Sequence, residues 1–185
     1  MGCMKNVSSQ TRENIAVYAG TFDPVTYGHL WMIDAGSRLF SKLIVAVGTN
    51  PEKECHFSTR ERVRMIDDVV EEYSNVVVDH YPNQFLIKYA ENMGAKFILR
   101  GIRSTADYEY EKSISYVNRH LNDKITTVFL LPPREMIEIS SSVVRGLIGP
   151  PGWEDVVSNY VPPSVLARLI EEENKRVKTP VDLGD

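Results

Sequence analysis

The sequence has little of what marks a secreted or membrane-bound protein. Its 185 residues include two cysteines, Cys3 and Cys55, which form neither a disulfide framework nor a metal-ligand spacing. No apolar run approaches the roughly 20 residues that span a bilayer, and Met1 to Glu13 is too polar for a secretory signal. We therefore expect a cytoplasmic protein with no membrane partner and two free thiols.

The sequence also lacks an excess of positive charge. Its 21 Lys and Arg residues are outnumbered by 25 Asp and Glu residues, which gives a net charge of -4 and a pI near 5.6. Binding along a nucleic acid needs a broad basic surface, so nucleic acid is not an expected partner. An anionic ligand has to be bound by a local cluster of groups. The length suits one globular domain.

Short apolar runs rich in β-branched residues alternate with longer segments of helical period. This alternation predicts an α/β fold with a single open, doubly wound, Rossmann-like sheet of parallel strands, flanked by helices and followed by C-terminal helices. A continuous apolar run such as that over 43–47 is typical of a strand buried on both faces. Five strands are expected, at residues 15–20, 43–47, 76–79, 97–99 and 126–130.

Helix signals lie between and after these strands. Ser58 and Glu61 have the spacing of a capping box, so a helix is expected to begin there. Another is expected over about 107–121, and its period turns Ile114, Val117 and Leu121 inward. Further helices are expected after residues 140–142, near 153–160 and after 162–163.

The first predicted strand runs into the segment G-T-F-D-P-V-T-Y-G-H at residues 20–29. At a strand-to-helix turn the helix N-terminus offers free amides, and Gly20 and Gly28 let a ligand come close. Ligands of open α/β sheets bind at the carboxyl ends of the strands. His29 could donate a hydrogen bond to a phosphate oxygen that gains charge during transfer. The alternative is a glycine-containing turn with a structural histidine.

Two later segments also follow predicted strands and carry phosphate-binding groups. Arg100 and Arg103 flank Gly101, and guanidinium groups bind phosphate oxygens in bidentate fashion. Three serines at 140–142 stand at an expected helix start, where hydroxyls and amides can hold phosphates. Taken alone, the arginines could belong to a solvated loop and the serines could be only N-caps.

Residues 20–29 resemble the signature G-x-F-D-x-x-H/T-x-G-H of the nucleotidyltransferase superfamily. From about residue 16 to about 169, the order and spacing of the motifs are similar to those of phosphopantetheine adenylyltransferases. R-G-I-R with D-Y-E-Y-E separates that family from its cytidylyltransferase relatives. The further motifs are P-E-K at 51–53, R-G-I-R at 100–103, D-Y-E-Y-E at 107–111, N-R-H-L at 118–121 and I-S-S-S-V-V-R at 139–145.

The resemblance implies a reaction and a domain layout. The reaction is transfer of the adenylyl group of ATP to 4'-phosphopantetheine, which gives dephospho-coenzyme A and pyrophosphate without a covalent enzyme intermediate. We expect a nucleotidyltransferase domain over residues 14–173, between a flexible leader at 1–13 and a flexible tail at 174–185.

The resemblance also implies the roles of individual residues. His29, Lys53 and Arg100 are the implied catalytic residues: His29 stabilises the transition state, and the other two face the acceptor phosphate. The implied ATP-binding residues are Gly20, Phe22, Asp23, Gly28, His29, Gly101, Arg103, Glu111, Ile139, Ser140, Ser141 and Ser142. The implied acceptor-binding residues are Thr21, Lys53, Phe85, Leu86, Arg100 and Asn118.

The family uses Mg²⁺ carried in with ATP, so no dedicated metal cage is expected. The resemblance further implies coenzyme A as a feedback ligand, a property of some relatives, and a homohexamer of two stacked trimers. Two alternatives stay open. One is a related nucleotidyltransferase for another phosphate monoester, such as a cytidylyltransferase, although the pattern R-T-x-G-I-S-T-T is absent. The other is a non-catalytic nucleotide sensor, which could lose the basic residues without losing its fold.

Overall fold

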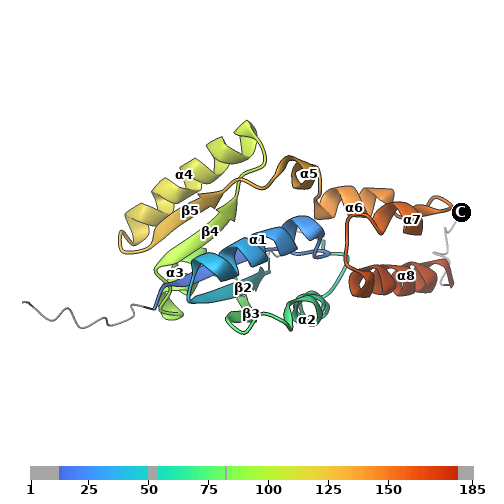
Figure 1. Ribbon diagram of the computed structural model, residues 1–185, viewed down its shortest axis with the longest axis horizontal. Coiled ribbons are helices and arrows are strands. Elements are labelled where there is room, and N and C mark those ends of the chain that lie inside the picture. Colours follow the sequence, from blue (N-terminus) through green and yellow to red (C-terminus); the bar gives the residue numbers. More distant parts are fainter. Residues whose placement is uncertain (1–12, 50–53, 82, 179–185) are drawn as a thin grey trace, which may run out of the picture.

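The computed structural model describes residues 13–49, 54–81 and 83–178 (Figure 1). Its strands form one parallel sheet in the order β3-β2-β1-β4-β5, which confirms the predicted fold class. The strands are β1 (Ile15–Gly20), β2 (Lys42–Gly48), β3 (Val76–Tyr81), β4 (Phe97–Gly101) and β5 (Thr126–Leu130). The helices are α1 (Tyr27–Leu39), α2 (Thr59–Val70), α3 (Leu86–Asn92), α4 (Thr105–Leu121), α5 (Arg134–Ile137), α6 (Ser141–Leu147), α7 (Trp153–Val157) and α8 (Pro163–Lys178).

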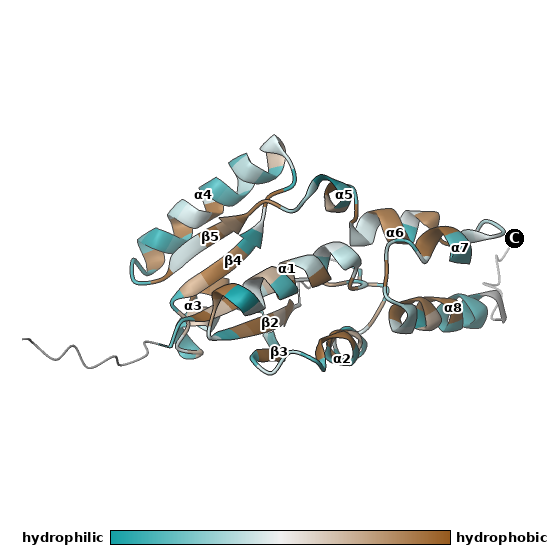
Figure 2. Ribbon diagram, viewed as in Figure 1, coloured by the Kyte–Doolittle hydropathy of each residue, from teal (hydrophilic) through white to brown (hydrophobic). Residues whose placement is uncertain are grey.

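Both faces of the sheet's centre are buried, because successive side chains of a strand point to opposite sides. On β1, Ala16 and Tyr18 belong to one core, which α1 and α2 cover, whereas Val17 and Ala19 belong to the other, which α3 covers. The central strands are accordingly apolar along their length (Figure 2). This confirms the interpretation of the continuous apolar runs.

The chain winds in one direction through β1, β2 and β3 and then crosses over to β4 on the other side of β1. The carboxyl ends of β1 and β4 are therefore neighbours at the point where the strand order reverses. In open α/β sheets, ligands bind at this point. α6, α7 and α8 lie beyond this edge, and buried Val165 and Leu169 join α8 to the core under α1 and α2 (Figure 1).

Most predicted boundaries agree with the structure. The capping box is present: the amide of Glu61 donates to Ser58, and Glu61 accepts from the amide of Ser58. α6 begins at Ser141 with Ser140 as its N-cap, so its first turn lies within the serine run instead of after it. α8 continues to Lys178, past residue 173, where the tail was expected to begin. The leader over 1–12, Lys53 and the residues after 178 lie outside the described residues.

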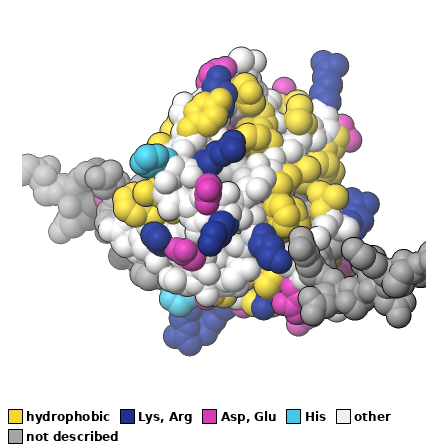
Figure 3. Space-filling view, turned by 90° about the vertical axis from the view of Figure 1, so that its left-hand side faces the viewer, with side chains coloured by type: hydrophobic (Ala, Val, Ile, Leu, Met, Phe, Trp, Pro, Cys, Tyr) yellow, Lys and Arg dark blue, Asp and Glu magenta, His cyan; other side chains and the backbone are white. Residues whose placement is uncertain are grey.

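The helix predicted over about 107–121 is present as α4, but the side that was predicted to face inward is wrong. Ile114, Val117 and Leu121 are 38%, 55% and 41% exposed, and the buried positions of the helix are Glu111 and Asn118. The inference assumed that an apolar stripe faces the core of its own chain, whereas α4 turns polar groups inward. Figure 3 faces the end of the molecule with α3 and the C-terminal end of α4, where apolar side chains reach the surface among charged ones.

Within the described residues, no helix is both long enough and apolar enough to cross a membrane.

Candidate active site

A cavity of about 400 Å³ opens where β1 and β4 end, bounded by the first turn of α1 and the segment from α5 to α6. Its walls include residues from the segments at 20–29, 100–103 and 139–142, each of which follows a predicted strand. The predicted site residues that line it are Gly20, Thr21, Phe22, Asp23, Gly28, His29, Arg100, Gly101, Arg103, Glu111, Ile139, Ser140, Ser141 and Ser142.

His29 stands in the first turn of α1 with its ring orientation fixed. The backbone nitrogen of Thr26 donates a hydrogen bond to His29 Nδ1 over 3.0 Å, and Thr26 Oγ1 lies 2.9 Å from the same atom. Because an amide nitrogen can only donate, Nδ1 carries no proton and the proton is on Nε2. Burial and the nearby charge of Arg103 lower the pKa of His29 to about 4. At neutral pH the ring is therefore an uncharged Nε2–H donor.

Phe22 packs against the ring of His29. Its φ of 51° lies in the left-handed region, which costs a residue other than glycine about 1–2 kcal/mol. The fully buried Phe22 ring packs edge-on against Tyr18 and against His29, with centroids 5.4 and 5.0 Å apart. The unusual backbone at Phe22 is thus held by the packing that places His29.

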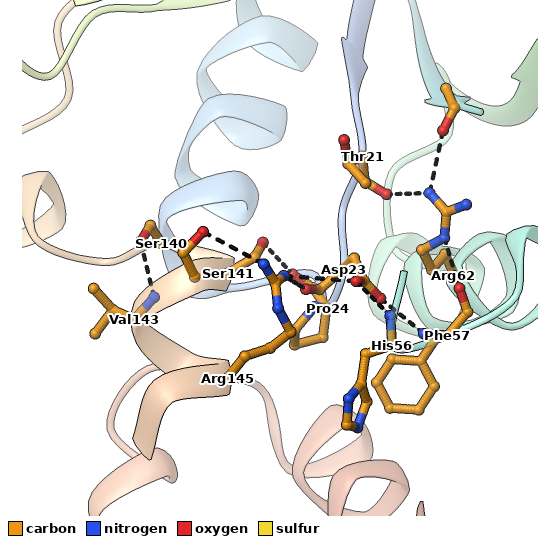
Figure 4. Close-up of polar contacts among 12 residues, drawn as sticks. Thr21, Asp23, Pro24, His56, Phe57, Arg62, Ser140, Ser141, Val143 and Arg145 are labelled. Carbon is orange, nitrogen blue, oxygen red and sulfur yellow. Dashed lines mark hydrogen bonds and ion pairs between the residues drawn. The ribbon is translucent and has the colours of Figure 1, made fainter. Parts of the chain in front are cut away.

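Asp23 organises the turn instead of facing the cavity with a free carboxylate. Its carboxylate accepts hydrogen bonds from the amides of His56, at 2.8 Å, and Phe57, at 2.9 Å (Figure 4). Its backbone oxygen accepts a hydrogen bond from Arg145 Nη1, which also lies 3.6 Å from the carboxylate. The side chain predicted to bind ATP therefore joins three segments of the protein.

Arg100 and Glu111 form an ion pair in the cavity wall. Arg100 Nε donates to Glu111 over 2.9 Å, and its Nη2 donates to the second carboxylate oxygen. Arg100 Nη1 also donates to the backbone oxygen of Ala19 at 2.9 Å. The guanidinium predicted to face the acceptor phosphate thus has a carboxylate partner in the free protein. Arg103 is more exposed and pairs with Asp107 at 3.1 Å.

The serine run closes the cavity opposite β4. Ser140 Oγ accepts from the amide of Val143 at 3.2 Å, so the N-cap interpretation is confirmed for this residue. Ser141 Oγ donates to the backbone oxygen of Pro24 at 2.8 Å, which ties α6 to the turn after β1. Ser142 lies 3.5 Å from an Arg145 nitrogen.

Three predicted acceptor-binding residues do not line this cavity. Phe85 is exposed at the N-cap of α3, and Leu86 packs against the core on the α3 side of the sheet. Asn118 is buried in α4. Lys53 cannot be placed, since it lies outside the described residues. The structure thus brings together the predicted phosphate-binding residues, whereas those predicted for the pantetheine arm are elsewhere.

The cavity also contains residues that the sequence reading missed. Tyr18 stands two positions before Gly20, so strand alternation could have placed it below the turn. Arg145 follows Ser142 at helical spacing, which puts both on one side of α6. Met32 lies beneath Gly101, with its sulfur 3.1 Å from where a Cβ would be.

Comparison with known proteins bears out the sequence signature. A family model described as cytidylyltransferase-like matches residues 17–147, so fold and site define a member of this class of nucleotidyltransferases. The chain is 54% identical over 155 residues to phosphopantetheine adenylyltransferase of Chromobacterium violaceum, across 84% of this chain and 94% of the relative. Its counterpart in Neisseria meningitidis serogroup C is 48% identical over 157 residues, across 85% and 92%. The chain belongs to the phosphopantetheine adenylyltransferase family.

Solved structures of other nucleotidyltransferases share the fold. Nicotinic acid mononucleotide adenylyltransferase of Plasmodium falciparum, complexed with NaAD, matches with a TM-score of 0.63 over 88% of this chain and 96% of the other. The two are 18% identical, so this likeness concerns the fold alone.

Proposed function

We propose that this chain transfers the adenylyl group of ATP to 4'-phosphopantetheine. An oxygen of the acceptor phosphate forms a bond to the α-phosphorus of ATP while the bond to the β-phosphate oxygen breaks. The products are dephospho-coenzyme A and pyrophosphate. The observation that carries the proposal is the fixed Nε2–H donor of His29, in one cavity with the guanidinium groups of Arg100 and Arg103.

His29 has the form that transition-state stabilisation requires. As charge builds on the oxygens of the α-phosphate, a donor already aimed at them gains strength without reorganising. The neutral ring keeps its proton on Nε2 because Nδ1 is occupied by the Thr26 amide. His29 acts here as a hydrogen-bond donor, and the transfer needs no general base on it.

Acceptor and nucleotide phosphates would bind on different sides of His29. On the acceptor side, Thr21 and Arg100 line the cavity and Lys53 is assigned there by family resemblance. The acceptor phosphate would compete with Glu111 for the Arg100 guanidinium. Holding both reactants in line converts a bimolecular step into an effectively unimolecular one.

On the nucleotide side, Arg103 and the start of α6 would grip the ATP phosphates. Gly28 allows this arrangement, since a Cβ there would lie 3.1 Å from the backbone oxygen of Ile139. The close approach brings the N-terminus of α1 against the segment that carries the serines. Gly101 and Met136 line the same cavity and are candidates for the nucleoside part.

We further propose that Mg²⁺ enters with ATP and neutralises phosphate charge. The described residues offer no group of three or more His, Cys, Asp or Glu side chains that could hold a metal ion. The carboxylate of Asp23 is occupied by two backbone amides. These residues fit an ion that is bound mainly through phosphates and water.

The proposal extends to assembly, regulation and location. Family resemblance supports a cytoplasmic homohexamer, and the exposed apolar side chains of α4 give it a surface to bury, among them Tyr110, Tyr116 and Val117. Coenzyme A carries the pantetheine arm and diphosphate of the product, so it is the proposed feedback ligand of this cavity.

Pyrophosphate release tests the reaction. Purified protein with Mg²⁺ and ATP should release pyrophosphate on addition of 4'-phosphopantetheine, and little with glycerol phosphate, nicotinamide mononucleotide or no acceptor. Replacing ATP by CTP should abolish release. Equal or faster release with another acceptor, or with CTP, would assign the chain to a related nucleotidyltransferase. ATP binding without release with any acceptor would favour the sensor.

A further inference from the structure

Arg62 is a buried cation that belongs to none of the motifs described above. It lies in the first turns of α2 and is 2% exposed. Every nitrogen of its guanidinium donates a hydrogen bond. Nε donates to the backbone oxygen of Phe57 at 3.1 Å, and Nη2 donates to Thr59 Oγ1 at 3.0 Å. Nη1 donates to the backbone oxygens of Thr21, at 2.6 Å, and Gly48, at 3.2 Å.

These contacts link both ends of the connection between β2 and α2 to Thr21, in the motif that follows β1. Gly48 is the last residue of β2, and Phe57 precedes the N-cap of α2, so the connection between them carries Lys53. Thr21 follows β1 and lines the cavity. Figure 4 shows Arg62 reaching from α2 to the backbone of Thr21. A single side chain thus joins the backbone of Thr21 to those of Gly48 and Phe57.

The charge of Arg62 is also unusual. Among the described residues, no carboxylate lies within ion-pair distance of it, unlike Arg100, which has Glu111. Burying a cation is costly unless other groups compensate it, and here the compensation comes from carbonyl oxygens and one hydroxyl. Because its charge is not cancelled by a neighbouring anion, Arg62 contributes positive potential behind Thr21.

We propose that Arg62 is a positioning residue for the acceptor phosphate. It holds the backbone of Thr21 in place against Gly48 and Phe57, and its charge favours a dianionic phosphate in front of Thr21. This inference rests on the proposed function. It predicts an asymmetric effect, because Arg62 contacts the acceptor side of the cavity and none of its bonds reaches the α6 side.

Steady-state kinetics of the full chain with both substrates tests the proposal. Arg62→Met should raise KM for 4'-phosphopantetheine at least about tenfold, the size expected for losing hydrogen bonds to a charged group, and should lower kcat. KM for ATP should stay within about twofold of the parent value. Arg62→Lys keeps the charge without the fork, so its KM for the acceptor should fall between those of Met and Arg.

Matched controls lie on the same helix. Arg60 and Arg64 are exposed on α2, so Arg60→Gln and Arg64→Gln should leave both KM values and kcat unchanged. Should Arg62→Met fail to fold, Thr59→Val removes one anchor of the guanidinium and keeps its charge. It should shift KM for the acceptor in the same direction by about two- to fivefold.

The outcomes are distinguishable. An acceptor KM within twofold of the parent in folded Arg62→Met, or equal rises in both KM values, would overturn the positioning role. A lower melting temperature with unchanged KM values would mean that Arg62 contributes to stability and not to acceptor binding. If the parent fails to turn over 4'-phosphopantetheine, the proposed function fails first, independently of any variant.

Discussion

The backbone nitrogen of Thr26 lies 3.0 Å from Nδ1 of His29 and donates a hydrogen bond to it. The donor of this contact is a main-chain group and not the hydroxyl of Thr26. It fixes the tautomer of His29 and leaves Nε2–H to face the cavity. The proposed role of His29 follows from this geometry.

His29→Ala should lower kcat by about 10²- to 10³-fold or more, the effect of removing one donor to a developing oxyanion. ATP affinity should change little, since the lost bond strengthens mainly in the transition state. Stopped-time pyrophosphate assays and equilibrium ATP binding measure the two quantities. His80→Ala, which changes an exposed histidine of β3, is the control and should behave as the parent. A kcat within tenfold of the parent would show that His29 has another role.

The low pKa of His29 predicts a particular pH dependence. Since the ring stays neutral down to about pH 4, kcat should show no inflection from this residue near pH 6.5. NMR titration of the imidazole signal that disappears in His29→Gln should give a pKa far below 6.5. A signal that titrates near 6.5 would contradict the buried, Nδ1-accepting ring.

The same shift links pH to stability. In the unfolded chain the imidazole takes up a proton near its usual pKa of 6.5, whereas in the folded chain it does so near 4. The unfolded state therefore binds more protons between these values, and stability falls as pH drops from about 6.5 to 4. Burial lowers the pKa of His56 as well, so it contributes in the same direction. The fall should be smaller in His29→Gln, as denaturant unfolding at pH 7 and pH 5 can measure.

Glu111→Gln should separate the stability of the free protein from its affinity for phosphate. Loss of the carboxylate leaves Arg100 without its ion-pair partner, at a cost of about 1–3 kcal/mol of folding free energy. The released guanidinium should bind the acceptor phosphate better, so 4'-phosphopantetheine should raise the melting temperature of Glu111→Gln more than that of the parent.

Glu109→Gln is the control for this experiment, because it breaks only an exposed pair with Lys112. It should change neither the melting temperature nor its dependence on 4'-phosphopantetheine. An equal response to 4'-phosphopantetheine in Glu111→Gln and parent would mean that Glu111 does not compete with the acceptor phosphate for Arg100.

The exposed apolar side of α4 predicts self-association. The parent should sediment as a species several-fold larger than its 21.0 kDa chain, as a hexamer requires. Tyr116→Glu combined with Val117→Glu places charge on side chains that are 64% and 55% exposed, and should shift the protein to smaller species.

Leu39→Glu provides the matched control, since Leu39 is an exposed apolar residue at the end of α1, away from α4. It should leave the sedimentation coefficient unchanged. A parent that sediments as a monomer at micromolar concentration would contradict the proposed assembly.

The order of strands and helices along the chain, and the family, could both be predicted from the amino-acid sequence. Both are local properties: apolar runs such as residues 43–47 predict strands buried on both faces, and the capping pair Ser58 and Glu61 marks a helix start. The segment from Gly20 to His29 is continuous in the sequence, so a strand-to-helix turn that can bind an anion was recognisable there without knowledge of its distant partners. For these reasons the fold class and most of the phosphate-binding residues could be predicted.

The pairing of charged side chains, by contrast, depends on how distant segments pack in the folded chain. Arg100 and Glu111 are on different elements, and their pairing depends on how α4 packs against β4. The same packing leaves Ile114, Val117 and Leu121 exposed. The helical period showed that these side chains share one side of α4, but it could not show whether that side packs against the sheet. Arg62 lies on the same side of α2 as the buried Met65 and Ile66, so the hydrophobic pattern of the helix did not predict a buried cation there. Its role depends on backbone oxygens from three segments, which come together only in the folded chain.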